Sequence, residues 1–179
     1  MIKAIETVYN GYRFRSRLEA RWAVCFDALS IKYRYEPEGF DLGDGYYYLP
    51  DFYLPEQGVW VEIKGQKLTE EEREKIERFC INKCDLANGG ERFRLFEGEI
   101  PKEAVMVGST PGIPCFVYSS PTEIKKAFEH YHGKCDKTPK AGALILGLWM
   151  NPMFTKELVD KALLKARQAR FEHGETPNI

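Results

Sequence analysis

The segment VWVEIK at residues 59–64 constrains the fold more than any other part of the sequence. Its side chains alternate in character with a period of two, which is the period of a β-strand and not of a helix. The aliphatic residues at odd positions are expected on one face of the strand, with Glu62 and Lys64 on the other. Two residues of strand span roughly 7 Å, so the Glu62 carboxylate and the Lys64 ammonium project side by side.

Other helices and strands are predicted on both sides of this strand. Apolar residues at helical spacing predict a helix over 15–29, and Ser16 and Glu19 have the spacing of a capping box at its start. Alternation predicts a strand over 31–36. The Gly-Asp-Gly turn at 43–45, followed by an aromatic run, predicts a hairpin that leads into a second strand.

Two prolines, Pro50 and Pro55, indicate that this second strand is irregular or lies at an edge of the sheet. After the strand at 59–64, Thr69 and Glu72 form a second capping box, which opens a helix that runs to about Cys84.

The second half of the chain gives weaker patterns. Short strands are expected at 92–98, 103–108 and 115–119, and helices at 120–133 and 155–171. The whole order predicts a mixed α/β domain. Residues 1–119 are expected to form its core, and residues 120–179 a helical extension that packs on the core or forms an interface.

Composition excludes several classes of protein. Of 179 residues, 44% are hydrophobic and 30% charged, which supports one core and rules out global disorder. The longest apolar run, 141–150, is about half a membrane span, and the N-terminus lacks an apolar signal core, so we expect a cytoplasmic protein with no membrane partner. Five cysteines, an odd number without an export signal, favour reduced thiols. With a net charge of −1, any binding of nucleic acid relies on a local basic patch.

Two carboxylates and one ammonium group are the candidates for catalysis or metal binding. Asp51 follows Pro50 at the end of a predicted strand, and Glu62 comes eleven residues later in the next strand. If those strands pair, Asp51, Glu62 and Lys64 converge. Carboxylate oxygens suit a magnesium ion, which activates water and neutralises charge on a phosphate oxygen, and a nearby lysine steadies the developing charge.

These motifs resemble the signature of the PD-(D/E)XK nuclease superfamily. YLPDFYLP followed by WVEIKG supplies Pro50-Asp51, the eleven-residue step and Glu62-x-Lys64. The upstream helix YRFRSRLEARWA is similar to the first helix of that fold, where Glu19 matches its acidic residue. The resemblance covers roughly residues 9–97 and extends to small uncharacterised proteins of phages and bacteria placed in the superfamily.

The resemblance implies a restriction-endonuclease-like αβββαβ core, with a mixed central sheet flanked by helices. It implies a metal-dependent endonuclease that hydrolyses phosphodiester bonds in DNA, duplex or branched, with Mg²⁺ as cofactor and Mn²⁺ as a substitute. Glu19, Asp51 and Glu62 would be metal ligands with the Ile63 carbonyl as a further one, and Lys64 would be the catalytic lysine. The setting would be the cytoplasm of a bacterial or phage-infected cell. Whether the chain forms a homodimer is left open, since related resolvases act as dimers that cut two strands symmetrically.

A basic set near the proposed site is a candidate for contacts with phosphates. Arg13, Arg17 and Arg21 are four residues apart and would fall along one helical stripe, with Arg15 beside them. Just past the lysine, Gln66 and Lys67 are further candidates for contact with the substrate backbone. The alternative is a solvated face held by salt bridges.

Each acidic residue also has a purely structural interpretation. Glu19 completes a capping box, Asp51 suits a turn, and Glu62 and Lys64 suit the solvated face of a half-exposed strand. A non-catalytic nuclease fold that binds DNA or a protein partner therefore remains a second hypothesis. A nuclease acting on RNA or on a nucleotide-linked substrate is a third.

Overall fold

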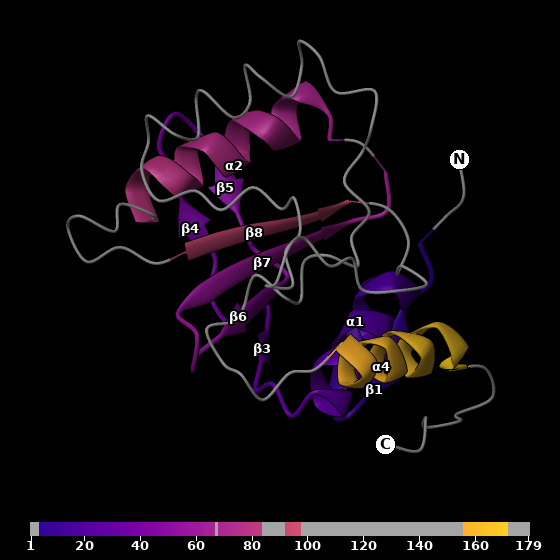
Figure 1. Ribbon diagram of the computed structural model, residues 1–179. Helices are drawn as coiled ribbons and strands as arrows, with labels where there is room; N and C mark the ends of the chain where they lie inside the picture. The colour runs from indigo at the N-terminus through magenta and orange to yellow at the C-terminus, as the bar shows by residue number, and fades with distance from the viewer. Residues whose placement is uncertain (1–3, 67, 84–91, 98–155, 172–179) are drawn as a thin grey trace, which may run out of the picture.

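Figure 1 shows a computed structural model of the chain, in which residues 4–66, 68–83, 92–97 and 156–171 are described. It is a mixed α/β protein, as the sequence predicts. In chain order the elements are β1 (Thr7–Tyr9), β2 (Tyr12–Phe14), α1 (Arg17–Ala28), β3 (Arg34–Tyr35), β4 (Phe40–Asp41), β5 (Tyr47–Tyr48), β6 (Phe52–Leu54), β7 (Val59–Lys64), α2 (Glu70–Lys83), β8 (Arg92–Glu97) and α4 (Lys156–Gln168).

The main sheet has four strands in the order β3-β6-β7-β8. The pairs β3–β6 and β6–β7 are antiparallel, and β7–β8 is parallel. In the β6–β7 register Phe52 lies opposite Val61, so Asp51, one residue before β6, comes level with Glu62. The sheet is therefore mixed, and its one parallel pair is joined through α2.

Helices cover both faces of this sheet. α1 and α4 lie together on one side, and α2 lies on the other (Figure 1). Val61 and Ile63 of β7 join the core under α1 and α4, whereas Trp60 joins the core under α2. β7 is thus buried on both faces, which explains why its first five residues are all inaccessible to solvent. The interpretation of Glu62 as part of a solvated strand face is wrong, because Glu62 is only 3% exposed.

Both predicted helix caps form, and the second is a complete capping box. Glu19 N donates to Ser16 Oγ at 3.2 Å at the start of α1. Glu72 N donates to Thr69 Oγ1 at 3.2 Å, and Thr69 N donates to Glu72 Oε2 at 2.8 Å before α2. Each cap satisfies amide groups that have no partner within the first turn of a helix.

The two hairpins are small sheets of their own. β4 and β5 pair around Gly43-Asp44-Gly45, whose positive φ angles suit a tight turn. This hairpin was predicted, but its second strand stays outside the main sheet. The β1–β2 hairpin turns at Asn10-Gly11, with φ angles of 48° and 79°. This hairpin was not predicted, although Asn-Gly between β-prone residues is a strong hairpin pattern.

The strand predictions differ from the structure in extent. β3 spans only Arg34–Tyr35 of the predicted 31–36. β6 is not at an edge: it lies between β3 and β7, and Pro50 and Pro55 stand outside its two ends, where a missing amide breaks no rung. The strand at 92–97 and the helix at 156–168 agree with prediction.

Several predictions fall on other parts of the chain. The strands at 103–108 and 115–119, the helix at 120–133 and the boundary between 1–119 and 120–179 lie outside the described residues. Within the described residues, no helix is both long enough and apolar enough to cross a membrane.

Candidate functional site

Asp51 is attached to β7 through its side chain. Its Oδ2 accepts a hydrogen bond of 2.6 Å from the backbone N–H of Ile63. Pro50 precedes Asp51 and offers no amide, so regular pairing ends there and the carboxylate takes the place of a backbone acceptor. The carboxylate of Asp51 is thereby fixed beside the segment that carries Glu62 and Lys64.

Glu62 and Lys64 form an ion pair on the α2 side of the sheet. Lys64 Nζ lies 2.9 Å from Glu62 Oε1 and 3.2 Å from Glu72 Oε1 at the start of α2. The hydroxyl of buried Tyr48 donates to Glu62 Oε2 at 2.9 Å. Both oxygens of a nearly inaccessible carboxylate are thus held, as a buried charge requires.

Glu19 approaches from the opposite face, on α1. Its Oε1 accepts from Ser16 Oγ at 2.5 Å, and its Oε2 accepts from Tyr35 Oη at 2.6 Å and from the Arg15 amide at 3.1 Å. Glu19 is 8% exposed. The capping role of Glu19 is therefore confirmed. The hydrogen bond from Tyr35 also fixes the Glu19 carboxylate beside β3, the strand that pairs with β6.

The carboxylates of Asp51, Glu62 and Glu19 interact electrostatically. Burial raises the pKa of Asp51 well above its usual range, and the charges of Glu62 and Glu19 raise it further. The hydrogen bond from the Ile63 amide and the charge of Lys64 oppose this rise only in part. Asp51 is therefore under the electrostatic influence of two other carboxylates, one on each side of the sheet, and a cation stabilises such an arrangement.

Lys64 is held in its charged form. Burial lowers the pKa of Lys64, but the carboxylates of Glu62, Glu72 and Asp51 outweigh burial and leave it raised. Burial likewise raises the pKa of Glu62, against the opposing effects of Lys64 and Tyr48. At neutral pH Lys64 is an ammonium that donates protons in hydrogen bonds and has no lone pair with which to accept one.

Glu36 is a neighbour that the sequence analysis did not place in the site. Its backbone N–H donates to Asp51 O at 2.9 Å, and its carboxylate pairs with Arg15 at 2.8 Å. Burial raises the pKa of Glu36, Arg15 opposes the rise, and the charges of Glu19 and Glu62 add to it. Its φ of 42° is unusual for a residue with a side chain, and such conformations cluster at functional sites. The sequence pattern that could have pointed to Glu36 is its position before Pro37, directly after a predicted strand.

The basic residues are arranged differently from the prediction. Arg13 lies in β2 and pairs with Glu6, so the expected stripe of three arginines along one helix is wrong at its first member. Arg15 precedes α1 and pairs with Glu36 beside the carboxylates. Arg17 and Arg21 do lie on α1, where they line a pocket with residues from the end of α4.

The remaining candidates are less informative. Gln66 is exposed directly after β7, and Lys67 lies outside the described residues. The Ile63 amide is occupied by Asp51, while the metal role of its carbonyl stays a prediction. Among the residues that the structure describes, no three His, Cys, Asp or Glu side chains are grouped closely enough to form a metal site by themselves.

No known protein family, curated protein or solved structure matches this chain. The site must therefore be interpreted from its own geometry, which brings Asp51, Glu62 and Lys64 together with Glu19 beside them.

Proposed function

We propose that this chain is a metal-dependent endonuclease that hydrolyses phosphodiester bonds in DNA. The observation that carries the proposal is the electrostatic state of Asp51. Its carboxylate has a pKa raised by burial and by two further carboxylates, and an ammonium stands next to one of them. A protein that needed these residues only for stability gains nothing from placing like charges together.

The element order supports the proposal. A helix, three antiparallel strands, a second helix and a parallel strand occur as α1, β3, β6, β7, α2 and β8. With the β4–β5 hairpin between β3 and β6 set aside, this order is compatible with the αβββαβ core that the resemblance to PD-(D/E)XK nucleases implies. Glu19 lies on the first helix, Asp51 precedes the second of these strands, and Glu62 and Lys64 lie on the third, which supports the proposed roles.

The carboxylates fit a magnesium ion in part. Magnesium commonly takes one or two protein carboxylates and completes its shell with water and substrate phosphate, so it does not need three protein ligands. Asp51 and Glu62 would hold the ion, with Glu19 at the margin. Asp51 accepts the Ile63 amide through Oδ2, and Oδ1 would be the oxygen that meets a cation. A bound divalent ion would activate water and neutralise charge on the phosphate.

The neighbouring residues position these groups. Tyr48 holds the Glu62 carboxylate, and the Ile63 amide holds that of Asp51. Lys64 is held between Glu62 and Glu72, so its ammonium has a fixed place beside the cluster. Because Lys64 stays protonated, its role is to orient water and stabilise negative charge at the phosphate rather than to remove a proton.

The second hypothesis, a non-catalytic fold that binds DNA or a partner, rests on a different observation. Both oxygens of Glu62 and both of Glu19 already accept hydrogen bonds or ion pairs. In a catalytically silent protein these contacts would serve packing alone.

A cleavage assay separates the two. Supercoiled, linear, branched and single-stranded DNA, with an RNA strand for comparison, are incubated with the protein in Mg²⁺, Mn²⁺ or chelator. The same assay is run on Asp51→Ala and Glu62→Ala. Glu71→Gln is a matched control, since Glu71 is exposed on α2 and pairs with Lys75. We expect metal-dependent cutting that both alanine variants lose and the control keeps. Cutting by the alanine variants at the parent rate would refute the proposal, and binding without cutting by any form would favour the second hypothesis.

A further inference from the structure

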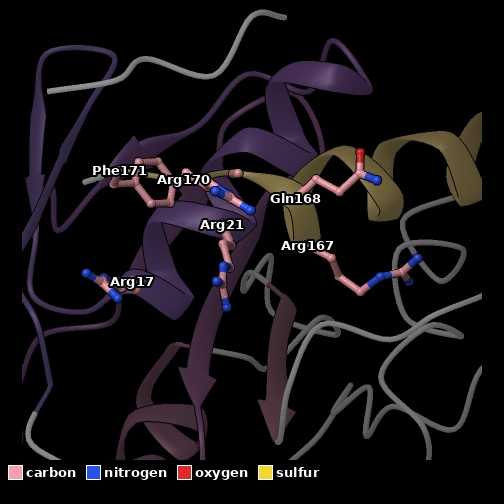
Figure 2. Close-up of a pocket in the computed structure, with 7 residues that line it drawn as sticks. Arg17, Arg21, Arg167, Gln168, Arg170 and Phe171 are labelled. Atoms are coloured by element: carbon pink, nitrogen blue, oxygen red, sulfur yellow. The ribbon is translucent and has the colours of Figure 1, made fainter. Parts of the chain in front are cut away.

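A basic pocket lies between α1 and the end of α4, on a different face of α1 from the carboxylates. It has a volume of about 540 Å³ and is lined by Arg17, Arg21, Arg167, Arg170 and Phe171, among others. Figure 2 shows Arg17 and Arg21 on α1, and the other side chains at the end of α4 and in the residues that follow it. The size is in the range of small-ligand sites.

The pocket concentrates positive charge. Four guanidinium groups line it, and none of the described lining residues is acidic. A concave surface lined by guanidinium groups favours an anionic ligand.

Arg21 supplies a second observation. Its Nε is buried, and within the described part of the chain no acceptor lies in hydrogen-bonding reach of it. A buried donor without an acceptor is costly, and an acceptor oxygen supplied by a ligand would relieve that cost. Arg170, by contrast, is exposed at the mouth of the pocket.

We propose that this pocket binds phosphate groups of a nucleic-acid strand. The planar fork of arginine matches phosphate oxygens in a bidentate manner, and four such groups suit either two adjacent phosphodiesters or one terminal phosphate of higher charge. Phe171, half-buried with its ring edge-on to Tyr9 at 6.0 Å, offers an aromatic surface for a base. An inorganic anion alone would not use that ring.

The pocket is placed to hold a strand that also reaches the carboxylates, and this part of the inference rests on the proposed function. Arg17 and Arg21 are four apart and share one face of α1, whereas Glu19 points to the other. The first turn of α1 lies against the end of β7: a Cβ added to Gly65 would meet Leu18 Cδ2 at 3.6 Å. The width of a helix, about 10 Å, corresponds to about three nucleotides of rise, so the bound phosphates lie near but outside the cleaved bond.

Binding measured in chelator tests the inference without any cleavage. Fluorescence anisotropy of labelled single-stranded and duplex DNA is recorded against salt for the parent, for Arg21→Gln/Arg170→Gln and for Lys32→Gln/Lys75→Gln. The lysine control removes the same charge at residues that pair with Glu56 and Glu71, outside the pocket. We expect the arginine variant to bind about 10- to 100-fold more weakly, with a salt slope lower by about one to two, while the control stays near the parent.

Matched oligonucleotides with and without a 5′ or 3′ phosphate identify the source of the phosphate. A loss confined to phosphorylated ends assigns the pocket to a terminal phosphate, and an equal loss on all strands assigns it to internal ones. Arg170→Gln alone, at an exposed position, repeats the test if the double variant does not fold.

Equal affinity and equal salt slope in the arginine and lysine variants would overturn the inference. The two proposals fail separately. A parent that binds through the arginines but never cuts would contradict the nuclease alone, and a parent that cuts while the arginine variant binds normally would contradict the pocket alone.

Discussion

Replacing Lys64 with methionine tests the ion pair at the centre of the site. The Lys64 side chain is 28% exposed and that of Glu62 only 4%, so the change leaves a nearly buried carboxylate without its counter-charge. Breaking a fully buried pair costs about 3–5 kcal/mol. Because Lys64 is partly solvated and Tyr48 still donates to Glu62, we expect a loss of about 2–3 kcal/mol in the free energy of unfolding. For a chain of this size the melting temperature would fall by about 4–12 °C.

The loss of stability in Lys64→Met depends on pH, and the pKa of Glu62 determines the direction of that dependence. The pKa of Glu62 in the folded protein is already raised above the ordinary 4.5, so protonation of Glu62 favours the fold. Removing Lys64 takes away an influence that lowers this pKa, and the pKa rises further. The deficit of Lys64→Met is therefore largest above the raised pKa and shrinks as the pH falls through it and Glu62 takes up a proton.

Thermal and denaturant unfolding from pH 5 to pH 8 measure the effect. The double variant Glu62→Gln/Lys64→Met is the control, since an uncharged amide still accepts from Tyr48 and needs no counter-charge. It should regain most of the stability and none of the cleavage. A Lys64→Met protein within about 0.5 kcal/mol of the parent at pH 8 would show that the pair is not the buried contact described above.

Three further changes probe the supports of the site. Ser16→Ala removes the cap of α1 and a donor to Glu19, and should cost about 1 kcal/mol in urea unfolding; no change would contradict the cap. Tyr35→Phe removes the 2.6 Å bond to Glu19 and should cost about 1.5–3 kcal/mol; a stability equal to the parent's would mean that Glu19 needs no fixed partner. Asp51→Asn keeps an acceptor for the Ile63 amide but removes a carboxyl group whose pKa is raised. In chelator it should therefore raise the melting temperature at neutral pH, and the gain should fade as the pH falls through the raised pKa. A lower melting temperature would refute the repulsion among the carboxylates.

The local parts of this structure were predictable from the sequence. Ser16 with Glu19 and Thr69 with Glu72 specify helix starts through contacts three residues apart, and both form. The alternation in 59–64 fixes which residues of β7 share a face. The convergence of Asp51 on Glu62 also followed, because it needs only that two neighbouring strands pair.

What the sequence did not reveal depends on contacts between distant segments. Burial of Glu62 on the α2 face requires a helix that covers that face, and alternation alone is equally typical of a strand exposed to water on one side. Glu36 enters the site through a backbone turn, and the arginines of α1 meet those of α4 only after the chain has folded. Arg13 was misplaced for a local reason: the Asn10-Gly11 hairpin keeps it out of the helix.

The most direct test of the central claim is the single-turnover rate of DNA cleavage in Mg²⁺ by the parent and by Glu62→Gln. Glutamine keeps the acceptor for Tyr48 and has nearly the same shape as glutamate, so a loss of rate reports the missing charge and not a disturbed fold. The account predicts cutting by the parent that stops in chelator and falls at least about 100-fold in Glu62→Gln. Equal rates for the two proteins, or cutting that persists in chelator, would contradict it.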